Sequence, residues 1–221
     1  MICMSRAALA AVALLTLAGC GNDTERTGVW TNLRDAAAAF GTARNAPPPA
    51  VPELTPAQVD GSPLRLLLLQ VESDGRGTGL ARISTNRGTE TYSTADAITV
   101  TLRDGVLIAT RGLVPDLMSA QAPSAQAIAR GAGSHQRQYH TLAGDDSQIT
   151  ESFTCTLQGQ GSQTLTIAGR SHATRVVAES CAGESGRFEN RYWIDTRGKI
   201  RQSSQWTGTS SGNLRLSDPQ P

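Results

Sequence analysis

The sequence predicts a mainly β protein: a strongly curved antiparallel sheet or barrel, with an N-terminal helix and one or two short accessory helices. Two observations support this fold class. From Leu64 onward, short apolar or alternating segments recur at fairly even spacing and are separated by glycine-containing turns, a pattern typical of antiparallel barrels and sandwiches. The clearest helical periodicity comes earlier, over Trp30–Arg44. We therefore expect one antiparallel β-domain over residues 61–208.

The first twenty residues have the order of a secretory signal peptide. A short segment with one cation, Arg6, precedes an apolar run, Ala7–Leu17, that is too short to span a bilayer. The sequence Leu-Ala-Gly-Cys then ends at Cys20 and resembles a bacterial lipoprotein signal, in which this cysteine carries acyl chains such as palmitate. In such lipoproteins an Asp at the next position retains the protein in the inner membrane, and Gly21 stands there instead. We expect a signal peptide at 1–19 and a lipid anchor at Cys20 on the periplasmic side of the outer membrane.

Residues 20–60 are expected to form the lipidated tether, the N-terminal helix and a Pro-rich connector. The segment 21–28 is small and polar, as suits a tether. Apolar residues at helical spacing and an alanine run predict a helix over Trp30–Arg44, which Pro47–Pro49 end. One further turn of helix is expected over Pro56–Val59.

The first half of the β-domain contains four clear strand signals. The nearly unbroken apolar run Leu64–Val71 indicates a strand buried on both faces. Gly79–Ser84 and Glu90–Ser93 follow, and Ile98–Leu102 alternates as a half-buried strand does. The next strand begins at Val106.

The hairpin at Asp104-Gly105 allows two loop lengths. A two-residue turn would place Val106 and Ile108 on the face of the polar Arg103. A three-residue loop, with Gly105 left-handed, would instead align them with the apolar Leu102. The apolar alignment favours the three-residue loop.

In the second half of the domain, Leu113–Arg130 interrupts the strand pattern, and a short helix is expected around Leu117 or over Ala125–Arg130. Strands are then expected at Gln138–Leu142, Glu151–Gln158, Thr164–Ala168, Ala173–Cys181, Arg187–Asp195 and Lys199–Trp206. Residues 209–221 form a polar tail that we expect to fray.

Charge and cysteine content restrict the class of protein. The chain has 20 Lys and Arg against 19 Asp and Glu, and Arg6 would leave with the signal peptide. A neutral mature chain argues against nucleic-acid binding and against electrostatic attachment to anionic lipid. Cys155 and Cys181 are expected to pair in an oxidising periplasm, which would stabilise the fold by roughly 3–4 kcal/mol. A two-thiol metal or redox site is the alternative, although the close Cys-x-x-Cys spacing is missing.

The sequence offers no clear catalytic, cofactor or metal motif. His135, His140 and His172 have no partner at metal-binding spacing, and no nucleophile elbow or phosphate loop occurs. We therefore expect a non-catalytic protein without cofactor or metal ion. The alternative is a glycan-modifying enzyme, which would need carboxylates that converge from separate strands. The candidates are Glu151, Glu179, Glu184, Glu189 and Asp195.

Three aromatic side chains near one hairpin are candidates for glycan or partner contact. Tyr192 and Trp193 are adjacent in a predicted strand and must point to opposite faces, so we expect at most one of them in the core. Of Trp193 and Trp206, one is expected in the core and the other at the rim. An exposed ring would stack on a sugar, as in a simple polysaccharide-binding module. Arg111, at a strand end where the chain leaves the sheet, is a further contact candidate.

Several runs resemble the YjbF/GfcB family of lipoproteins. Order and spacing agree from about Arg34 to Gly208. The runs that carry the resemblance are Ala97–Leu113, Asp116–Ser119, Glu179–Cys181, Asn190–Asp195, Gly198–Ile200 and Ser203–Gln205.

The resemblance implies an outer-membrane lipoprotein that is encoded with exopolysaccharide or group-four capsule genes. It implies a curved antiparallel sheet or barrel with accessory helices, and an accessory role in assembly or secretion with no established enzymatic activity. The partners would be outer-membrane lipid, through acylated Cys20, and the export proteins, the polysaccharide, or both. Within this picture Arg111 and its neighbours either specify the fold or contact a partner.

Overall fold

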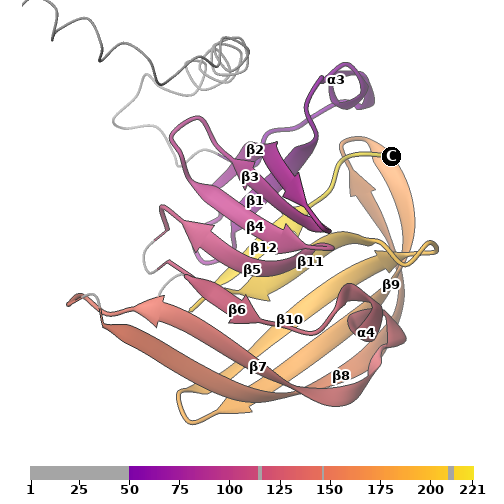
Figure 1. The fold of residues 1–221 in the computed structure, drawn as a ribbon. Coiled ribbons are helices and arrows are strands. Elements are labelled where there is room, and N and C mark those ends of the chain that lie inside the picture. Colours follow the sequence, from indigo (N-terminus) through magenta and orange to yellow (C-terminus); the bar gives the residue numbers. More distant parts are fainter. Residues whose placement is uncertain (1–49, 114–115, 146, 209–211) are drawn as a thin grey trace, which may run out of the picture. The chain divides into compact units, whose positions relative to one another are not determined.

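The computed structural model describes residues 50–113, 116–145, 147–208 and 212–221 (Figure 1). The expected signal peptide, Cys20 and the expected helix over Trp30–Arg44 lie outside the described residues. The described chain is mainly strand, with two short helices, α3 (Pro56–Asp60) and α4 (Ala125–Arg130). The predicted fold class is therefore confirmed.

Twelve strands form one antiparallel sheet in which neighbours in the chain are neighbours in space, and the first strand also pairs with the last. Between β5 and β6 no strand ladder is recorded, and Thr110 N–H donates to the Leu117 carbonyl across this gap at 2.9 Å. The sheet is thus an up-and-down barrel that is closed except at this seam. In chain order the strands are β1 (Leu66–Val71), β2 (Gly77–Asn86), β3 (Thr89–Ser93), β4 (Thr99–Arg103), β5 (Val106–Arg111), β6 (Ser119–Gln121), β7 (Ala132–Leu142), β8 (Gln148–Ile167), β9 (Arg170–Gly183), β10 (Gly186–Asp195), β11 (Ile200–Trp206) and β12 (Asn213–Ser217).

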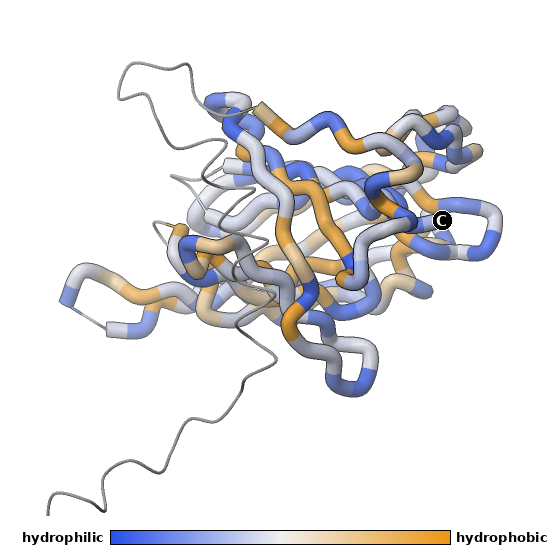
Figure 2. The backbone as a smooth tube through the Cα atoms, turned by 90° about the horizontal axis from the view of Figure 1, so that it is seen from above, coloured by the Kyte–Doolittle hydropathy of each residue, from blue (hydrophilic) through white to orange (hydrophobic). Residues whose placement is uncertain are grey.

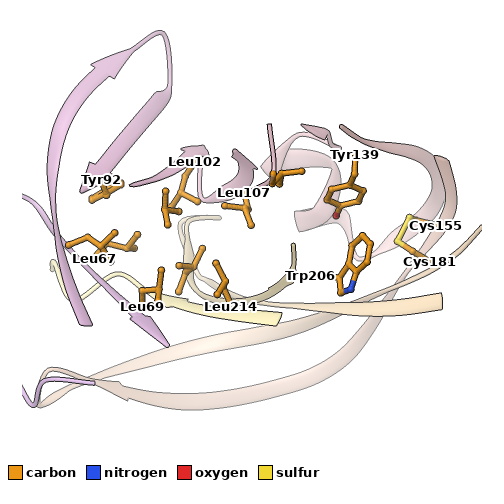
Figure 3. Close-up of a cluster of buried hydrophobic side chains, with 14 of the residues drawn as sticks. Leu67, Leu69, Tyr92, Leu102, Leu107, Tyr139, Cys155, Cys181, Trp206 and Leu214 are labelled. Atoms are coloured by element: carbon orange, nitrogen blue, oxygen red, sulfur yellow. A yellow bond between two sulfur atoms is a disulfide. The ribbon is translucent and has the colours of Figure 1, made fainter. Parts of the chain in front are cut away.

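The main core fills the inside of the barrel. Leu67 and Leu69 of β1 point inward and meet Leu102 of β4, Leu107 of β5 and Leu214 of β12 (Figure 3). Figure 2 shows the same distribution along the chain, because hydrophobic stretches lie in the strands and hydrophilic residues gather at the turns. Burial of this apolar surface is the main favourable contribution to folding.

A second cluster covers part of the outer face. Leu68 and Trp193 point outward from β1 and β10 and are only 7% exposed, because Val51 and Leu54 of the connector pack against their cluster. The far part of the long β8–β9 hairpin contributes Ile167 to the same cluster. The prediction that β1 is buried on both faces is therefore confirmed, and the connector is the segment that covers its outer side.

Helix α4 fills the barrel near one end. Ser124 caps its first turn, and Gly131 ends it in the left-handed conformation, with φ 67°. Ile128 is fully buried in a cluster with Tyr192 and Ile200 of the opposite wall. The expected helix over Ala125–Arg130 is confirmed, as is the turn of helix at Pro56–Val59, which extends to Asp60 as α3. In contrast, residues 116–118 are not helical.

The β4–β5 hairpin differs from its prediction. Arg103 pairs with Val106, so Asp104 and Gly105 form a two-residue turn, with both φ angles positive at 50° and 86°. The register then shifts between Thr101 and Leu102, which leaves Ile108 as the additional residue of a bulge in β5. Leu107, rather than Val106 or Ile108, therefore faces Leu102, and the three-residue loop was wrong.

Two other expectations were wrong for related reasons. The two strands expected at Glu151–Gln158 and Thr164–Ala168 are one strand, β8, with an irregularity between Gly159 and Ser162 that bends it without ending it. The expected fraying tail, 209–221, contains β12, which pairs with both β1 and β11. Leu214 and Leu216 are buried, so this short alternating segment has a core face.

The contribution of β12 can be measured at Leu214, which is fully buried. Leu214→Ala should lower the free energy of unfolding by about 2–5 kcal/mol, because it removes core contacts and leaves a cavity where the barrel closes. Ser217→Ala, at a half-buried position of the same strand, is the matched control and should cost less than about 1 kcal/mol. Equal losses in chemical denaturation would show that β12 contributes no core face.

Candidate functional site

A fully buried carboxylate, Glu179 of β9, forms the centre of a polar cluster inside the barrel. Its Oε1 accepts a hydrogen bond from Arg137 Nε at 2.7 Å and lies 2.6 Å from His135 Nε2. Its Oε2 accepts hydrogen bonds from Asn190 Nδ2 at 2.7 Å and from the Tyr192 hydroxyl at 2.9 Å. Both oxygens are therefore saturated by donors from β7 and β10.

The guanidinium of Arg137 is equally enclosed. Its Nη1 donates to the Tyr139 hydroxyl at 3.1 Å and its Nη2 to the Tyr192 hydroxyl at 2.7 Å. Asn190 extends the cluster, because its Oδ1 accepts from the backbone N–H of Trp206 at 2.7 Å. The cluster thus links β7, β9, β10 and β11 by hydrogen bonds across the interior.

The surroundings of Glu179 hold it ionised. Burial by itself raises the pKa of this carboxyl, but the hydrogen bond from His135 and the charge of Arg137 outweigh burial and lower the pKa to about 2. Burial likewise raises the pKa of the Tyr192 hydroxyl, which stays protonated and donates to Glu179. A general acid needs a raised pKa and a proton to give, so Glu179 has the electrostatic character of a structural ion pair.

The other candidate acids do not converge on Glu179. Asn190 is its partner in the ladder and shares its face, so the neighbouring Glu189 points to the opposite side, where it pairs with Arg191 at 2.8 Å. Asp195 lies five residues farther along β10 than Asn190, a distance of about 17 Å.

The candidates on β8 and in the β9–β10 turn are also distant from Glu179. Leu157 of β8 is the other ladder partner of Glu179, and Glu151 is six residues from Leu157 along that strand, a distance of about 20 Å. Glu184 lies in the exposed β9–β10 turn. A glycosidase pair needs carboxyl groups about 5–10 Å apart, and these positions do not supply one around Glu179.

The donors His135, Cys155 and Glu179 lie within 4.8 Å of one another, which is close enough to be tested as a metal site. They do not fit one. The sulfur of Cys155 is bonded to Cys181, so it is not a thiolate, and both Glu179 oxygens already accept hydrogen bonds from cationic or neutral donors.

The expected disulfide between Cys155 and Cys181 is confirmed. The two residues are ladder partners in β8 and β9, with Cα atoms 4.1 Å apart, and both are buried. Because His135 pairs with Cys155 in the neighbouring ladder, the bond lies beside the Glu179 cluster. The disulfide and the ion pair therefore stiffen the same part of the wall.

The three aromatic candidates are all buried. Tyr192 is fully buried and Trp193 is 7% exposed, on opposite faces as predicted, so the expectation that at most one is in the core was wrong. Trp206, 9% exposed, stacks on Phe188 with ring centroids 4.4 Å apart, in the interior rather than at the rim. None of these three rings presents an open face on which a sugar could stack.

Arg111 and His140 have local partners, whereas the buried Nε2 of His172 has none. Arg111 is exposed, but its Nη1 donates to the Leu117 carbonyl at 3.0 Å and its Nη2 to the Met118 carbonyl at 3.3 Å, so it ties down the chain at the seam. His140 Nδ1 lies 2.9 Å from the Thr150 hydroxyl. His172 is half-buried, and burial followed by the charge of Arg201 lowers its pKa.

A polar cavity of about 440 Å³ opens at one end of the barrel. Its rim includes the β2–β3, β4–β5 and β10–β11 turns, and its floor includes Leu67 and Leu216. The charged side chains that line it are Arg65, Arg197, Lys199, Arg201, Glu90, Asp104 and Asp218. Sequence reasoning missed this cavity, because its lining comes from turns far apart in the chain.

Comparison with known proteins decides the family. The model of a family described as "Group 4 capsule polysaccharide lipoprotein gfcB, YjbF" matches residues 33–217, a span that includes every strand from β1 to β12. The chain belongs to this family. The resemblance noted in the sequence is thus confirmed, and the family is one of lipoproteins associated by name with capsule polysaccharide.

One relative is similar in sequence over a short segment, and one solved structure is similar in fold. A segment of 48 residues is 40% identical to the uncharacterized lipoprotein YjbF of Escherichia coli (strain K12), and it covers 22% of this chain and 23% of that protein. The match therefore spans less than a quarter of the relative's length. The crystal structure of the hypothetical lipoprotein YmcC from Escherichia coli (K12) superposes with a TM-score of 0.67, covering 85% of this chain and 94% of that one at 19% identity. The two proteins share a fold.

Within the described residues, neither helix has the length and apolarity needed to cross a bilayer.

The Glu179 cluster can be tested by Glu179→Gln. The change should lower the free energy of unfolding by about 3–5 kcal/mol, because the buried Arg137 would lose its counter-charge. The pKa of Glu179 lies below its ordinary value of 4.5, so its ionisation stabilises the fold fully above about pH 4.5, and this stabilisation is lost as pH falls toward 2. The E179Q protein should lack that part of the acid dependence in urea titrations at several pH values.

Glu189→Gln, at an exposed ion pair on the adjacent strand, is the control and should change the free energy of unfolding by less than about 1 kcal/mol. An E179Q curve parallel to wild type below pH 4.5 would contradict the assignment of Glu179.

Proposed function

We propose that this protein is a non-catalytic lipoprotein that assists exopolysaccharide or capsule assembly and export at the outer membrane. The observation that carries the proposal is the family match over residues 33–217, because the family is named for group 4 capsule polysaccharide and the match includes the whole described sheet. Its partners would be export proteins, the polysaccharide itself, or both.

The chemistry of the interior supports a non-catalytic role. The most buried carboxylate, Glu179, has a lowered pKa and four donors on its two oxygens, so it has neither a proton to give nor a free lone pair directed at a substrate. The three candidate aromatic rings for stacking on a glycan are all buried, Tyr192 and Trp206 in the interior and Trp193 on the outer face beneath the connector. Contact with polymer or partner proteins would therefore involve the polar surface and the cavity at the barrel end.

Lipid is the proposed means of attachment. The side-chain charges of the mature chain nearly cancel, so electrostatic binding to anionic lipid would be weak. Acyl chains contribute about 0.8 kcal/mol per buried CH₂, and several chains on Cys20 would hold the protein durably. In this organisation residues 1–19 are removed, residues 20–60 tether the protein, and the β-domain follows.

Deletion of the protein in its own bacterium should lower the amount of surface polysaccharide while cytoplasmic sugar-nucleotide pools stay unchanged, because the defect would lie after precursor synthesis. Surface polymer is measured by extraction and uronic-acid or total-sugar assay, and the pools by chromatography. Complementation with wild type should restore the polymer, and complementation with S217A is a control for expression of a variant. Unchanged surface polymer in the deletion strain would refute the proposal. A variant series in which a single carboxylate-to-amide change abolished export from a stably folded protein would favour a glycan-modifying enzyme instead.

Attachment is tested at two adjacent positions. Cys20→Ser should release the protein from the membrane fraction, because the acylated thiol is gone, whereas Gly21→Asp should keep it lipidated and move it to the inner-membrane fraction. Sucrose-gradient fractionation with immunoblotting measures both. Gly21→Asn, which has a similar size and no charge, is the matched control. A C20S protein that still sediments with outer membrane would contradict lipid anchoring.

A further inference from the structure

The topology of the barrel places alternate turns at opposite ends. Because consecutive strands are antiparallel neighbours around the ring, the β1–β2, β3–β4, β5–β6, β7–β8, β9–β10 and β11–β12 connections lie at one end. The β2–β3, β4–β5, β6–β7, β8–β9 and β10–β11 connections lie at the other end, together with the start of β1 and the end of β12. The cavity of about 440 Å³ opens at this second end.

The charges of the described connections are sorted between these ends. The connections at the first end, which we call the acidic end, contain one base, Arg76, and six acids: Glu72, Asp74, Asp96, Asp116, Asp145 and Glu184. The connections at the second end, which we call the basic end, contain one acid, Asp104, and the bases Arg87, Arg130, Arg197 and Lys199. The segments before β1 and after β12 add Arg65 and the acids Asp60 and Asp218 at this end. In a chain that is nearly neutral overall, the connections thus bear net positive charge at the end where the cavity opens and net negative charge at the opposite end, which favours approach of an anion to the cavity.

Two cations at the cavity rim have capacity for a ligand. The Arg197 side chain is 69% exposed, and its recorded carboxylate contact, Asp195 Oδ2, is 3.7 Å away. Lys199 contacts Asp218 at 2.7 Å, but the same carboxylate oxygen also accepts from Arg65 at 2.7 Å. An incoming carboxylate would therefore meet Arg197, whose contact with Asp195 is long, and Lys199, which shares its carboxylate partner with Arg65.

The turn that carries these cations is held in a fixed shape. Asp195 Oδ1 accepts hydrogen bonds from the backbone N–H groups of Arg197 and Lys199, both at 2.9 Å, and its Oδ2 accepts from Arg201 Nε at 2.8 Å. Gly198 supplies the positive φ of 85° that the turn requires. Little conformational entropy remains to be lost in this backbone when a ligand binds.

The rest of the cavity suits a hydroxyl-rich ring. The hydroxyl-bearing residues Thr85, Tyr92 and Ser203 line it beside the carboxylates of Glu90 and Asp104. Carboxylates and hydroxyls together offer both acceptors and donors, which sugar hydroxyls need. A volume of about 440 Å³ is within the range of small-ligand sites.

We propose that the cavity at the basic end binds a carboxylate-bearing sugar unit of a polysaccharide chain, with Arg197 and Lys199 contacting the carboxylate. The assignment rests on the proposed function for the polymer and on the sorted charges for the acidic sugar. It gives the protein a preference for acidic over neutral glycan, and a defined end at which the glycan arrives.

The test uses the full-length protein in detergent and oligogalacturonate as the probe, with binding followed by calorimetry. The fully methyl-esterified oligosaccharide is the matched ligand, because it keeps the sugar rings and removes the charge. Wild type should bind the acid at least about tenfold more tightly than the ester. The double variant R197Q/K199Q should lose most of that difference, and the single variant R197Q should lose part of it.

The matched protein control is R76Q/R187Q, which removes the same number of charges from exposed positions at the acidic end. It should bind the acid within about twofold of wild type. Thermal melts of all variants verify folding. Equal binding of acid and ester, or an acid affinity unchanged in a folded R197Q/K199Q protein, overturns the inference.

The inference and the proposed function fail separately. If wild type binds neither oligosaccharide while deletion still lowers surface polymer, the inference is refuted and the proposed function stands. If the acid binds as expected while deletion leaves the polymer unchanged, the site is supported and the export role is refuted.

Discussion

Pairing between β1 and β12 joins the two ends of the strand meander, and most of the arrangement follows from it. Leu68 opposite Ser217 and Val71 opposite Leu214 set the register that turns an open twisted sheet into a ring. Closure removes the unpaired edges of β1 and β12, leaves only the seam between β5 and β6, and creates an interior that must be filled. A ring of twelve strands is wider than an eight-stranded barrel, whose side chains alone fill the centre, and here α4 and long inward side chains such as Arg137 occupy the additional space.

The wide interior explains why a charged cluster lies within a hydrophobic core. A buried ion pair adds little net stability compared with apolar packing, because both charges lose their hydration. The cluster instead offers directional bonds, since Glu179 accepts a hydrogen bond from Arg137 on β7, two strands away, and from Asn190 on β10. Because hydrogen bonds are directional, they fix the relative positions of these strands, whereas non-directional apolar contacts allow several arrangements. The disulfide between Cys155 and Cys181 covalently fixes the strand register beside them.

Features that depend on local sequence patterns could be predicted from this chain, and features that depend on distant residues could not. The positions of β9, β10 and β11 were predictable, because alternation and glycine turns are local signals. The geometry of the β4–β5 hairpin was not predictable. One additional residue was needed to align the apolar faces of β4 and β5, and the sequence did not show whether that residue belongs to the turn or to a strand. In the structure it is Ile108, which forms a bulge in β5. Alternation of Leu214 and Leu216 with polar residues was present in the tail, but it is short and its meaning depends on β1, about 150 residues earlier. The candidate sites depended on the same long-range information: Glu179 was visible as an acid, but its partner Arg137 is 42 residues away. The burial of Trp193 depends on the connector, which covers the outer face at Val51 and Leu54.

The position of β12 also determines when the protein can finish folding. Ten further strands lie between β1 and β12 in the chain, so one side of β1 stays unpaired until all of them have been synthesised. Closing so long a loop is entropically costly and slow, and contacts of this sequence separation are typical of slow-folding β proteins. Until closure, β1 and β11 present open edges on which another chain can add a strand. Late closure therefore makes folding depend on keeping these edges away from other chains, and it makes loss of β12 more damaging than the polarity of residues 212–221 suggests.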